Sequence, residues 1–195
     1  ALMFSPDNSK IILVDGLIRI HDSSTGEKIR FIEIERGIGR TKLSPDGTKV
    51  IKIEDVTGCF AETVTVWDIN RCRKLHTLQR HEHMINSMAF SDDGKRFVSA
   101  SRDGTIKLWD VSKEKEITTI KEEASAIALS PDGTKIISIG GEQSFLLKMW
   151  NAETGKEIDS IVCRSGSECI QISPDGRWML TGNKDSTISL YKIEE

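Results

Sequence analysis

The stretch that decides the fold runs from His81 to Lys121 and reads HEHMINSMAF SDDGKRFVSA SRDGTIKLWD VSKEKEITTI K. It contains four short runs rich in β-branched and aromatic residues, at 85–90, 96–100, 105–111 and 117–120. Between them, Ser91-Asp-Asp-Gly94 and Arg102-Asp-Gly104 supply Asp for local hydrogen bonds and Gly for a positive φ. Since each run is too short for a helix, the stretch predicts a four-stranded antiparallel sheet.

The same pattern recurs along the chain. The turn motif Ser-x-Asp-Gly returns at 44–47, 130–133 and 173–176, with a degenerate copy, Ser-Pro-Asp-Asn, at 5–8. The five serines are spaced by 39, 47, 39 and 43 residues. An aromatic residue or His follows each serine at the end of a later strand-like run: His21, Trp67, Trp109, Trp150 and Tyr191. One four-stranded sheet is marginal alone, so we expect the repeats to stabilise one another.

A period near forty residues, with four strands ending in Trp-Asp, is typical of WD40 propeller blades. On these motifs the chain resembles the WD40-repeat family over its whole length. The resemblance implies an all-β propeller segment of about five four-stranded blades, at approximately 1–35, 37–80, 84–121, 124–163 and 168–195. The last blade holds only three strand-like runs, so nineteen strands are predicted, with no helix and no linker.

The opening residues, Ala1-Leu-Met-Phe4, match the second half of an innermost strand. We therefore expect the remaining blades to lie elsewhere in a longer parent chain, completing a ring of about seven. The five copies alone are not expected to close. The apolar side chains Ile11, Leu13, Ile188 and Leu190 should then be partly exposed, and the last strand should keep unpaired backbone groups.

Composition narrows the partner classes. The net charge of −3 has both signs interspersed, which favours neither nucleic acid nor a membrane surface as a partner. The four cysteines, Cys59, Cys72, Cys163 and Cys169, show no Cys-x-x-Cys spacing, so thiols in a cytoplasmic or other reducing intracellular compartment are favoured over disulfides. No Walker motif or Gly-x-Ser-x-Gly elbow is present, so we expect no cofactor and no enzymatic activity in this segment.

Four residues of the third repeat carry chemistry. His81, Ser99, Asp103 and Trp109 match a hydrogen-bonded quartet typical of WD40 repeats. A Ser-His-Asp triad is the catalytic alternative, but a structural network that serves the buried indole N–H is favoured. His81 with Cys72 and His83 does not have zinc spacing, so no metal site is expected. Blade four keeps Ser138 and Trp150. Blade five keeps Thr181 and Asp185, with Cys163 near the His position, and blade two has Trp67 alone.

The turns define two rims. Tight turns between the first and second and the third and fourth strands share one rim and look structural. The other, the crossing rim, carries the second-to-third-strand loops and the crossings between blades, where binding residues concentrate. Its candidate partner-binding residues are Arg36, Phe60, Arg80, His83, Arg102, Arg164 and Lys184. A solvated rim is the preferred alternative, because glutamates alternate with these cations.

The resemblance implies a non-catalytic protein–protein interaction scaffold that presents a rigid rim within a larger assembly. The alternatives are a regulatory or sensor segment of a multidomain enzyme, such as an NTPase or kinase, and a reader of phosphorylated or acidic peptides through the rim arginines.

Overall fold

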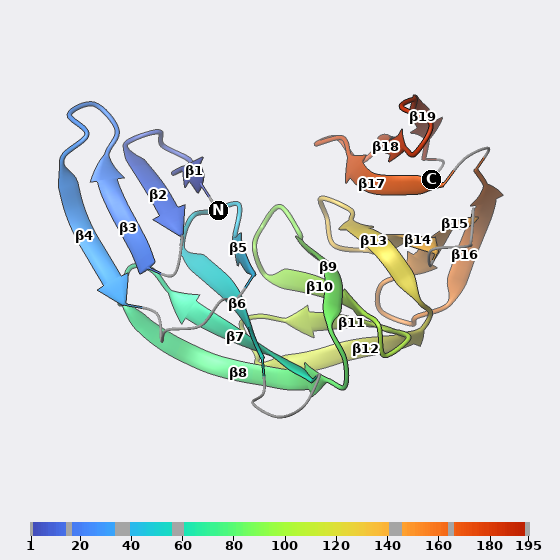
Figure 1. Cartoon of the computed structure of the whole chain (residues 1–195), viewed down its shortest axis with the longest axis horizontal. Coiled ribbons are helices and arrows are strands. Elements are labelled where there is room, and N and C mark those ends of the chain that lie inside the picture. Colours follow the sequence, from blue (N-terminus) through green and yellow to red (C-terminus); the bar gives the residue numbers. More distant parts are fainter. Residues whose placement is uncertain are drawn as a thin grey trace. The chain divides into compact units, whose positions relative to one another are not determined.

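The fold comes from a computed structural model, which describes residues 2–14, 17–33, 40–55, 61–140, 146–163 and 166–193. These residues form nineteen β-strands and no helix, which confirms the predicted all-β class. The strands are arranged in five antiparallel sheets, four with four strands and the last with three (Figure 1). The chain divides into two compact units, Ala1–Glu82 and His83–Glu195, and each has its own core.

The first unit contains blades one and two, whose strands pair in sequence order. Blade one consists of β1 (Leu2–Phe4), β2 (Lys10–Val14), β3 (Leu17–Asp22) and β4 (Lys28–Glu33). Blade two consists of β5 (Thr41–Leu43), β6 (Lys49–Asp55), β7 (Glu62–Asp68) and β8 (Arg73–His81). The Asp15-Gly16 pair, which the sequence predicts as a two-residue hairpin turn, lies outside the described residues, and Val14 pairs with Ile18 across it.

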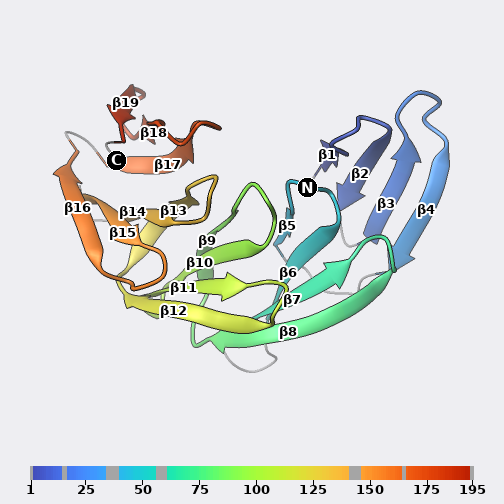
Figure 2. The ribbon, with the colours of Figure 1, turned by 180° about the vertical axis from the view of Figure 1, so that it is seen from behind.

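The second unit contains blades three, four and five, also visible from behind in Figure 2. Blade three consists of β9 (Ile85–Phe90), β10 (Arg96–Ser101), β11 (Thr105–Asp110) and β12 (Lys115–Lys121). Blade four consists of β13 (Ala124–Leu129), β14 (Lys135–Gly140), β15 (Leu146–Asn151) and β16 (Glu157–Val162). Blade five consists of β17 (Ser167–Ile172), β18 (Trp178–Asn183) and β19 (Ile188–Lys192).

Most strand bounds agree with the predicted ones within one or two residues, apart from the end of β8. The sequence predicts the innermost strands of blades one and two at about 1–5 and 38–43; β1 and β5 have three described residues each, and positions 1, 38 and 39 lie outside the described residues. The sequence predicts the outermost strand of blade two at about 73–79, with His81 in the crossing after it, whereas β8 continues to His81. The reason is that β7 begins at Glu62, one residue earlier than predicted, and Glu62 pairs with His81.

The Ser-x-Asp turns close the innermost hairpins in the same way in every blade. In blade two, Ser44 Oγ donates to Asp46 Oδ1 at 2.5 Å, and the Lys49 amide donates back to Ser44 Oγ at 2.9 Å. Gly47 has a φ of 65°, and in the degenerate first copy Asn8 takes the same region with a φ of 56°. The predicted turn chemistry is therefore confirmed, including its glycine-free copy.

Hydrogen bonds to the turn aspartates hold their carboxyl groups ionised. In Asp7 they come first from Ser5 and then from Ser9, and they lower the pKa to about 2. In Asp46, burial opposes ionisation, but hydrogen bonds from Ser44 and Thr48 prevail and lower the pKa. The pKa is lowered at the aspartates of the five Ser-x-Asp turns, Asp7, Asp46, Asp93, Asp132 and Asp175, and also at Asp22 and Asp110, which lie in turns between the third and fourth strands. We call these the turn aspartates.

Each core lies between successive blades of one unit. In the first unit, the apolar faces of β2 and β3 pack with Leu43, Val50, Trp67 and Ile69 of blade two. In the second unit, β10 and β11 pack in the same way with blade four, including Trp150 and Ala152. Another cluster joins blade four to blade five through Ile172, Met179 and Ile193. Trp67 and Trp150 thus belong to the interfaces of blades two and four with the blades before them.

The partial exposure predicted for four apolar side chains is confirmed. Ile11 and Leu13 of β2 are half-buried, while Ile188 and Leu190 of β19 are 74% and 60% exposed. On the same face of blade five, Leu180 pairs with Leu190 and is also exposed. Whether further blades cover these faces stays a prediction.

Candidate functional site

The third blade fixes its tryptophan through a side-chain hydrogen bond. Trp109 on β11 and Ser99 on β10 are both buried, and the indole Nε1 donates to Ser99 Oγ at 3.1 Å. Lys107 lies over the ring, with its Nζ 5.7 Å from the ring centroid and 2.8 Å from Glu116 Oε2. A buried indole N–H needs an acceptor, and Ser99 supplies it.

The remaining members of the predicted quartet are buried or engaged as well. Asp103, in the β10–β11 turn, accepts hydrogen bonds from the Thr105 amide at 2.9 Å and the Thr105 hydroxyl at 2.6 Å. His81 is fully buried at the end of β8, in the first unit. The network through His81 stays a prediction. Because Ser99 is fully buried and already accepts from Trp109, its hydroxyl is not presented to a substrate, which argues against a triad.

Blades four and five repeat parts of this arrangement. In blade four, Trp150 Nε1 donates to Ser138 Oγ at 2.8 Å, as the sequence predicts. In blade five, the Tyr191 hydroxyl lies 3.6 Å from the buried Cys163 Sγ, at the position where blade three has its histidine. Burial and then the neighbouring Cys163 raise the pKa of Tyr191. Tyr191 and Cys163, which replace the tryptophan and the histidine of blade three, therefore still contact each other through their side chains.

Blade two contains an acceptor that the sequence analysis missed. Trp67 Nε1 donates to Thr65 Oγ1 at 3.3 Å, and Thr65 Oγ1 donates to the Lys52 carbonyl at 3.2 Å. In blade three a serine on the second strand faces a lysine on the third, Ser99 opposite Lys107. In blade two the two residue types are exchanged, with Lys52 opposite Thr65. That exchange is readable in the sequence once the register is known.

The crossing rim of the second unit is built on Arg102. The Arg102 amide donates to the Met84 carbonyl at 2.8 Å, and Ser101 Oγ donates to the His83 carbonyl at 2.9 Å. The Arg102 Nε donates to Asn86 Oδ1 at 3.3 Å, and the side chain is exposed. Met84 beside it is 42% exposed. The backbone of this turn is thus fixed while a cation and an apolar side chain face solvent.

Blade five repeats this turn with Lys184. The Lys184 amide donates to the Gly166 carbonyl at 2.8 Å, as the Arg102 amide does to Met84. Asp185 accepts from the Thr187 amide at 3.0 Å and from its hydroxyl, as Asp103 does from Thr105. Lys184 is exposed. Two blades therefore present a cation from the same position of equivalent turns.

Of the other predicted rim residues, the structure describes the side chain of His83 alone. His83 is half-buried beside Met84. Arg36, Phe60 and Arg164, and the side chain of Arg80, lie outside the described residues. Within the described part of the chain, no group of three or more His, Cys, Asp or Glu side chains is placed to hold a metal ion. Nor is any helix there long and apolar enough to cross a membrane.

Comparisons with known proteins relate the repeats to one family. The WD domain, G-beta repeat model of the WD40 family matches residues 72–110 and 159–192. The first match begins at Cys72, directly before β8, and the second begins within β16; both end at or next to the end of the third strand of the following blade. A curated relative is the small ribosomal subunit protein RACK1 of Caenorhabditis elegans, 27% identical over 71% of this chain and 46% of that protein. Autophagy-related protein 16 of Arabidopsis thaliana is 28% identical over 91% of this chain and 34% of that protein.

Structural comparison supports the same fold. A chain in the crystal structure of the mitotic checkpoint complex superposes with a TM-score of 0.77 at 20% identity, over 99% of this chain and 60% of that one. The chain thus spans about half or less of the length of RACK1 and autophagy-related protein 16. The family-model matches at residues 72–110 and 159–192 and the relatives support a WD40-repeat protein, and the antiparallel sheets and the structural neighbour agree with the propeller fold of that family.

Proposed function

We propose that the chain is a non-catalytic scaffold that binds other proteins through its crossing rim, as part of a larger assembly. The observation that carries this proposal is the pair of exposed cations, Arg102 and Lys184, on turns whose backbone is hydrogen-bonded to the preceding crossing. Side chains held on a rigid scaffold lose less conformational entropy on binding, which favours affinity and specificity.

The chemistry of this rim suits a partner surface with acidic and apolar groups. Arginine can bind a carboxylate through two parallel hydrogen bonds, and the exposed Met84 beside Arg102 adds an adaptable apolar contact. The names of the relatives support an assembly role, because RACK1 is a ribosomal subunit protein and the structural neighbour comes from a multiprotein complex. A reducing intracellular location for this chain is part of the proposal.

A segment of a larger multidomain protein is the second candidate. The chain is 26% identical to human apoptotic protease-activating factor 1 over 86% of its own length but only 14% of that protein. In such a protein the propeller would regulate an enzymatic domain elsewhere. The two candidates differ in what would adjoin the propeller: further blades favour the scaffold, whereas a Walker motif favours the regulatory segment.

Affinity capture with the full chain tests the scaffold. The test variant combines Arg102→Glu and Lys184→Glu, and the matched control is Lys156→Glu, an exposed lysine on the tight-turn rim of the same unit. Exposed substitutions change stability by about 0.5 kcal/mol or less, so all variants should melt within about 2 °C of one another. We expect the double variant to lose proteins that the wild type and the control retain. Identical captured sets for all three would contradict this use of the crossing rim.

A further inference from the structure

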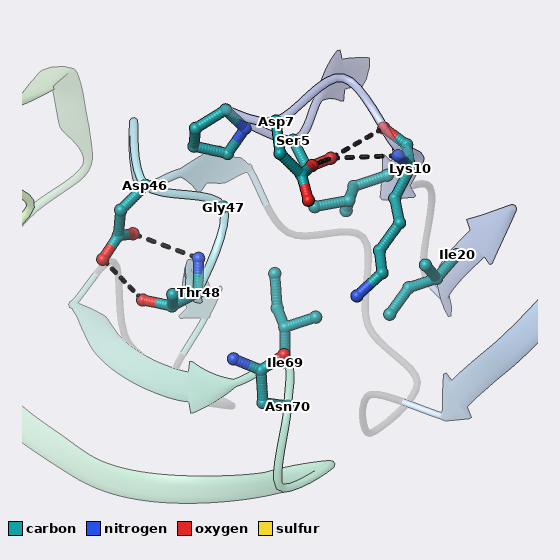
Figure 3. A pocket seen from close by; sticks show the side chains of 11 residues that line it. Ser5, Asp7, Lys10, Ile20, Asp46, Gly47, Thr48, Ile69 and Asn70 are labelled. Atoms are coloured by element: carbon teal, nitrogen blue, oxygen red, sulfur yellow. Dashed lines mark hydrogen bonds between the residues drawn. The ribbon is translucent and has the colours of Figure 1, made fainter. Parts of the chain in front are cut away.

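A pocket of about 320 Å³ lies between blades one and two of the first unit, on the tight-turn rim rather than the crossing rim. Its floor is apolar and consists of the buried side chains Ile12, Ile20 and Ile69. Its mouth is polar, and Figure 3 shows the Lys10 side chain extending into it, with Asn70 on the opposite wall. The volume is at the lower end for ligand pockets and suits one or two side chains.

The same position in the second unit is closed by an ion pair. Lys10 and Arg96 are equivalent, because each follows a turn serine by five residues and its carbonyl accepts from that serine's amide. Arg96 Nη1 donates to the Gly133 carbonyl at 2.8 Å, and Arg96 Nη2 lies 3.5 Å from Glu153 Oε1. A Cβ added at Gly133 would lie 2.8 Å from Arg96 Cδ, so the arginine occupies this space.

In the first unit, other residues stand at the positions of Arg96 and Glu153. Asn70 stands where blade four has Glu153, since it follows Ile69 as Glu153 follows Ala152, and both Ile69 and Ala152 donate to the same turn position. Near Gly47 the neighbours of an added Cβ are Ile12, Pro6 and Ser5 rather than Lys10. Among the described residues, no carboxylate lies within ion-pair distance of the Lys10 amino group.

A second cation lies beside Asn70 but outside the lining of the pocket. Arg30 on β4 donates from Nη1 to the Asn70 carbonyl at 2.9 Å, where blade three uses the hydroxyl of Thr118 on the Glu153 carbonyl. The pocket between blades one and two is thus lined by one cation, Lys10, and lacks the glutamate carboxylate that pairs with Arg96 at the equivalent site. Asp7 and Asp46 also line the pocket, and the second unit has the equivalent turn aspartates Asp93 and Asp132. In both units these carboxylates accept hydrogen bonds from backbone amides of their own turns.

We propose that this pocket binds a glutamate side chain from an acidic segment of a partner protein. Lys10 and the Asn70 amide would hold the carboxylate that Glu153 supplies within the chain in the second unit. The three isoleucines would contact the methylene groups or an adjoining apolar residue. Arg30, which donates to the Asn70 carbonyl, would attract further acidic residues of the same segment from outside the pocket. This site is separate from the crossing rim and does not depend on it.

Methyl NMR of the full chain tests the proposal, with isoleucine δ1 methyl groups labelled. The probe is the capped peptide acetyl-Gly-Leu-Glu-Leu-Gly-amide, and the comparison peptide carries Gln in place of Glu. We expect saturable shifts at Ile12, Ile20 and Ile69, and binding of the Gln peptide weaker by about three- to tenfold. Raising NaCl from about 20 to about 500 mM should reduce that difference, because an open pocket is screened by salt.

Three variants separate the site from the fold. Lys10→Met should remove the preference for Glu over Gln, and Asn70→Glu should weaken binding by placing a carboxylate at the site. Lys10→Arg combined with Asn70→Glu should abolish binding and raise the melting temperature, because it rebuilds the closed arrangement of Arg96 and Glu153. The control Lys156→Met should bind like the wild type, and unchanged shifts at Ile51 and Ile53, which are buried in the first unit outside the pocket, would show an intact fold.

Several results would overturn the proposal. Equal binding of the Glu and Gln peptides would show that no carboxylate is recognised. Shifts confined to other isoleucines would exclude the site. The absence of a saturable shift up to about 10 mM peptide would also exclude it, because even a dissociation constant of 1 mM, which corresponds to about 4 kcal/mol of binding free energy, gives saturation in that range. Tighter binding of acetyl-Gly-Leu-Leu with a free carboxyl terminus would identify a chain terminus as the occupant and contradict a glutamate side chain.

Discussion

Replacing Trp109 by Ala should destabilise the second unit far more than replacing Tyr191 by Ala. Trp109 is almost completely buried and hydrogen-bonded to Ser99, so its removal leaves a cavity and an unused buried hydroxyl. The expected cost is about 3–5 kcal/mol. Tyr191 is only half-buried and its hydroxyl makes a 3.6 Å contact with Cys163, so its removal should cost about 1 kcal/mol.

Circular dichroism during urea and thermal unfolding measures both variants. For a chain of this length, 1 kcal/mol corresponds to about 2–4 °C, so Trp109→Ala should lower the melting temperature by about 6–20 °C and Tyr191→Ala by about 2–4 °C. Trp109→Phe keeps most of the ring volume and should fall between them. Since both residues lie in His83–Glu195, one transition reports on both. Equal midpoints for the two alanine variants would refute the assignment of Trp109 to a closed core.

Three further results are expected. Gly133→Ala should cost about 1–3 kcal/mol more stability than Gly104→Ala. Both glycines have a positive φ, but only at Gly133 would the new Cβ meet Arg96. In an Arg96→Ala background the two substitutions should cost the same, and a remaining difference in stability would contradict the packing argument. The turn aspartates have folded-state pKa values below the unfolded value, so their stabilisation should be present above about pH 4 and lost as the pH falls towards about 2; a melting temperature unchanged between pH 5 and pH 2.5 would be inconsistent with this. The double variant His81→Ala with Ser99→Ala should lose less stability than the sum of the two single variants, by about 0.5–3 kcal/mol in a double-mutant cycle, because the two residues are expected to belong to one network. Additive losses would show that they do not interact.

The sequence predicted the fold well because each blade is determined locally. The serine and aspartate of every inner turn are fixed by hydrogen bonds within six residues, such as Ser44 to Asp46 and Lys49 to Ser44. Strand ends were predicted less well where pairing between strands sets them. The extension of β8 to His81 depends on the start of β7 at Glu62, and a pattern read along one strand cannot show it.

The candidate site was only partly predictable for a related reason. Trp109 with Ser99 and Trp150 with Ser138 follow the family pattern, so the sequence was sufficient for them. The acceptor of Trp67 is Thr65 on its own strand, which requires the register between β6 and β7. The pocket at Lys10 depends on which residue of the following blade faces it, and only the packed structure identifies that residue as Asn70.

Site-specific photo-crosslinking tests the central claim most directly, namely that the crossing rim of this propeller segment binds a protein. A photoreactive phenylalanine analogue is placed at Met84, which is 42% exposed beside Arg102, and in a second sample at Lys156 on the tight-turn rim. The scaffold function predicts a discrete crosslinked partner from position 84, absent when Arg102→Glu and Lys184→Glu are introduced, and none from position 156. Crosslinks from position 156 alone, or crosslinks from position 84 that persist unchanged in the Arg102→Glu and Lys184→Glu chain, would contradict it.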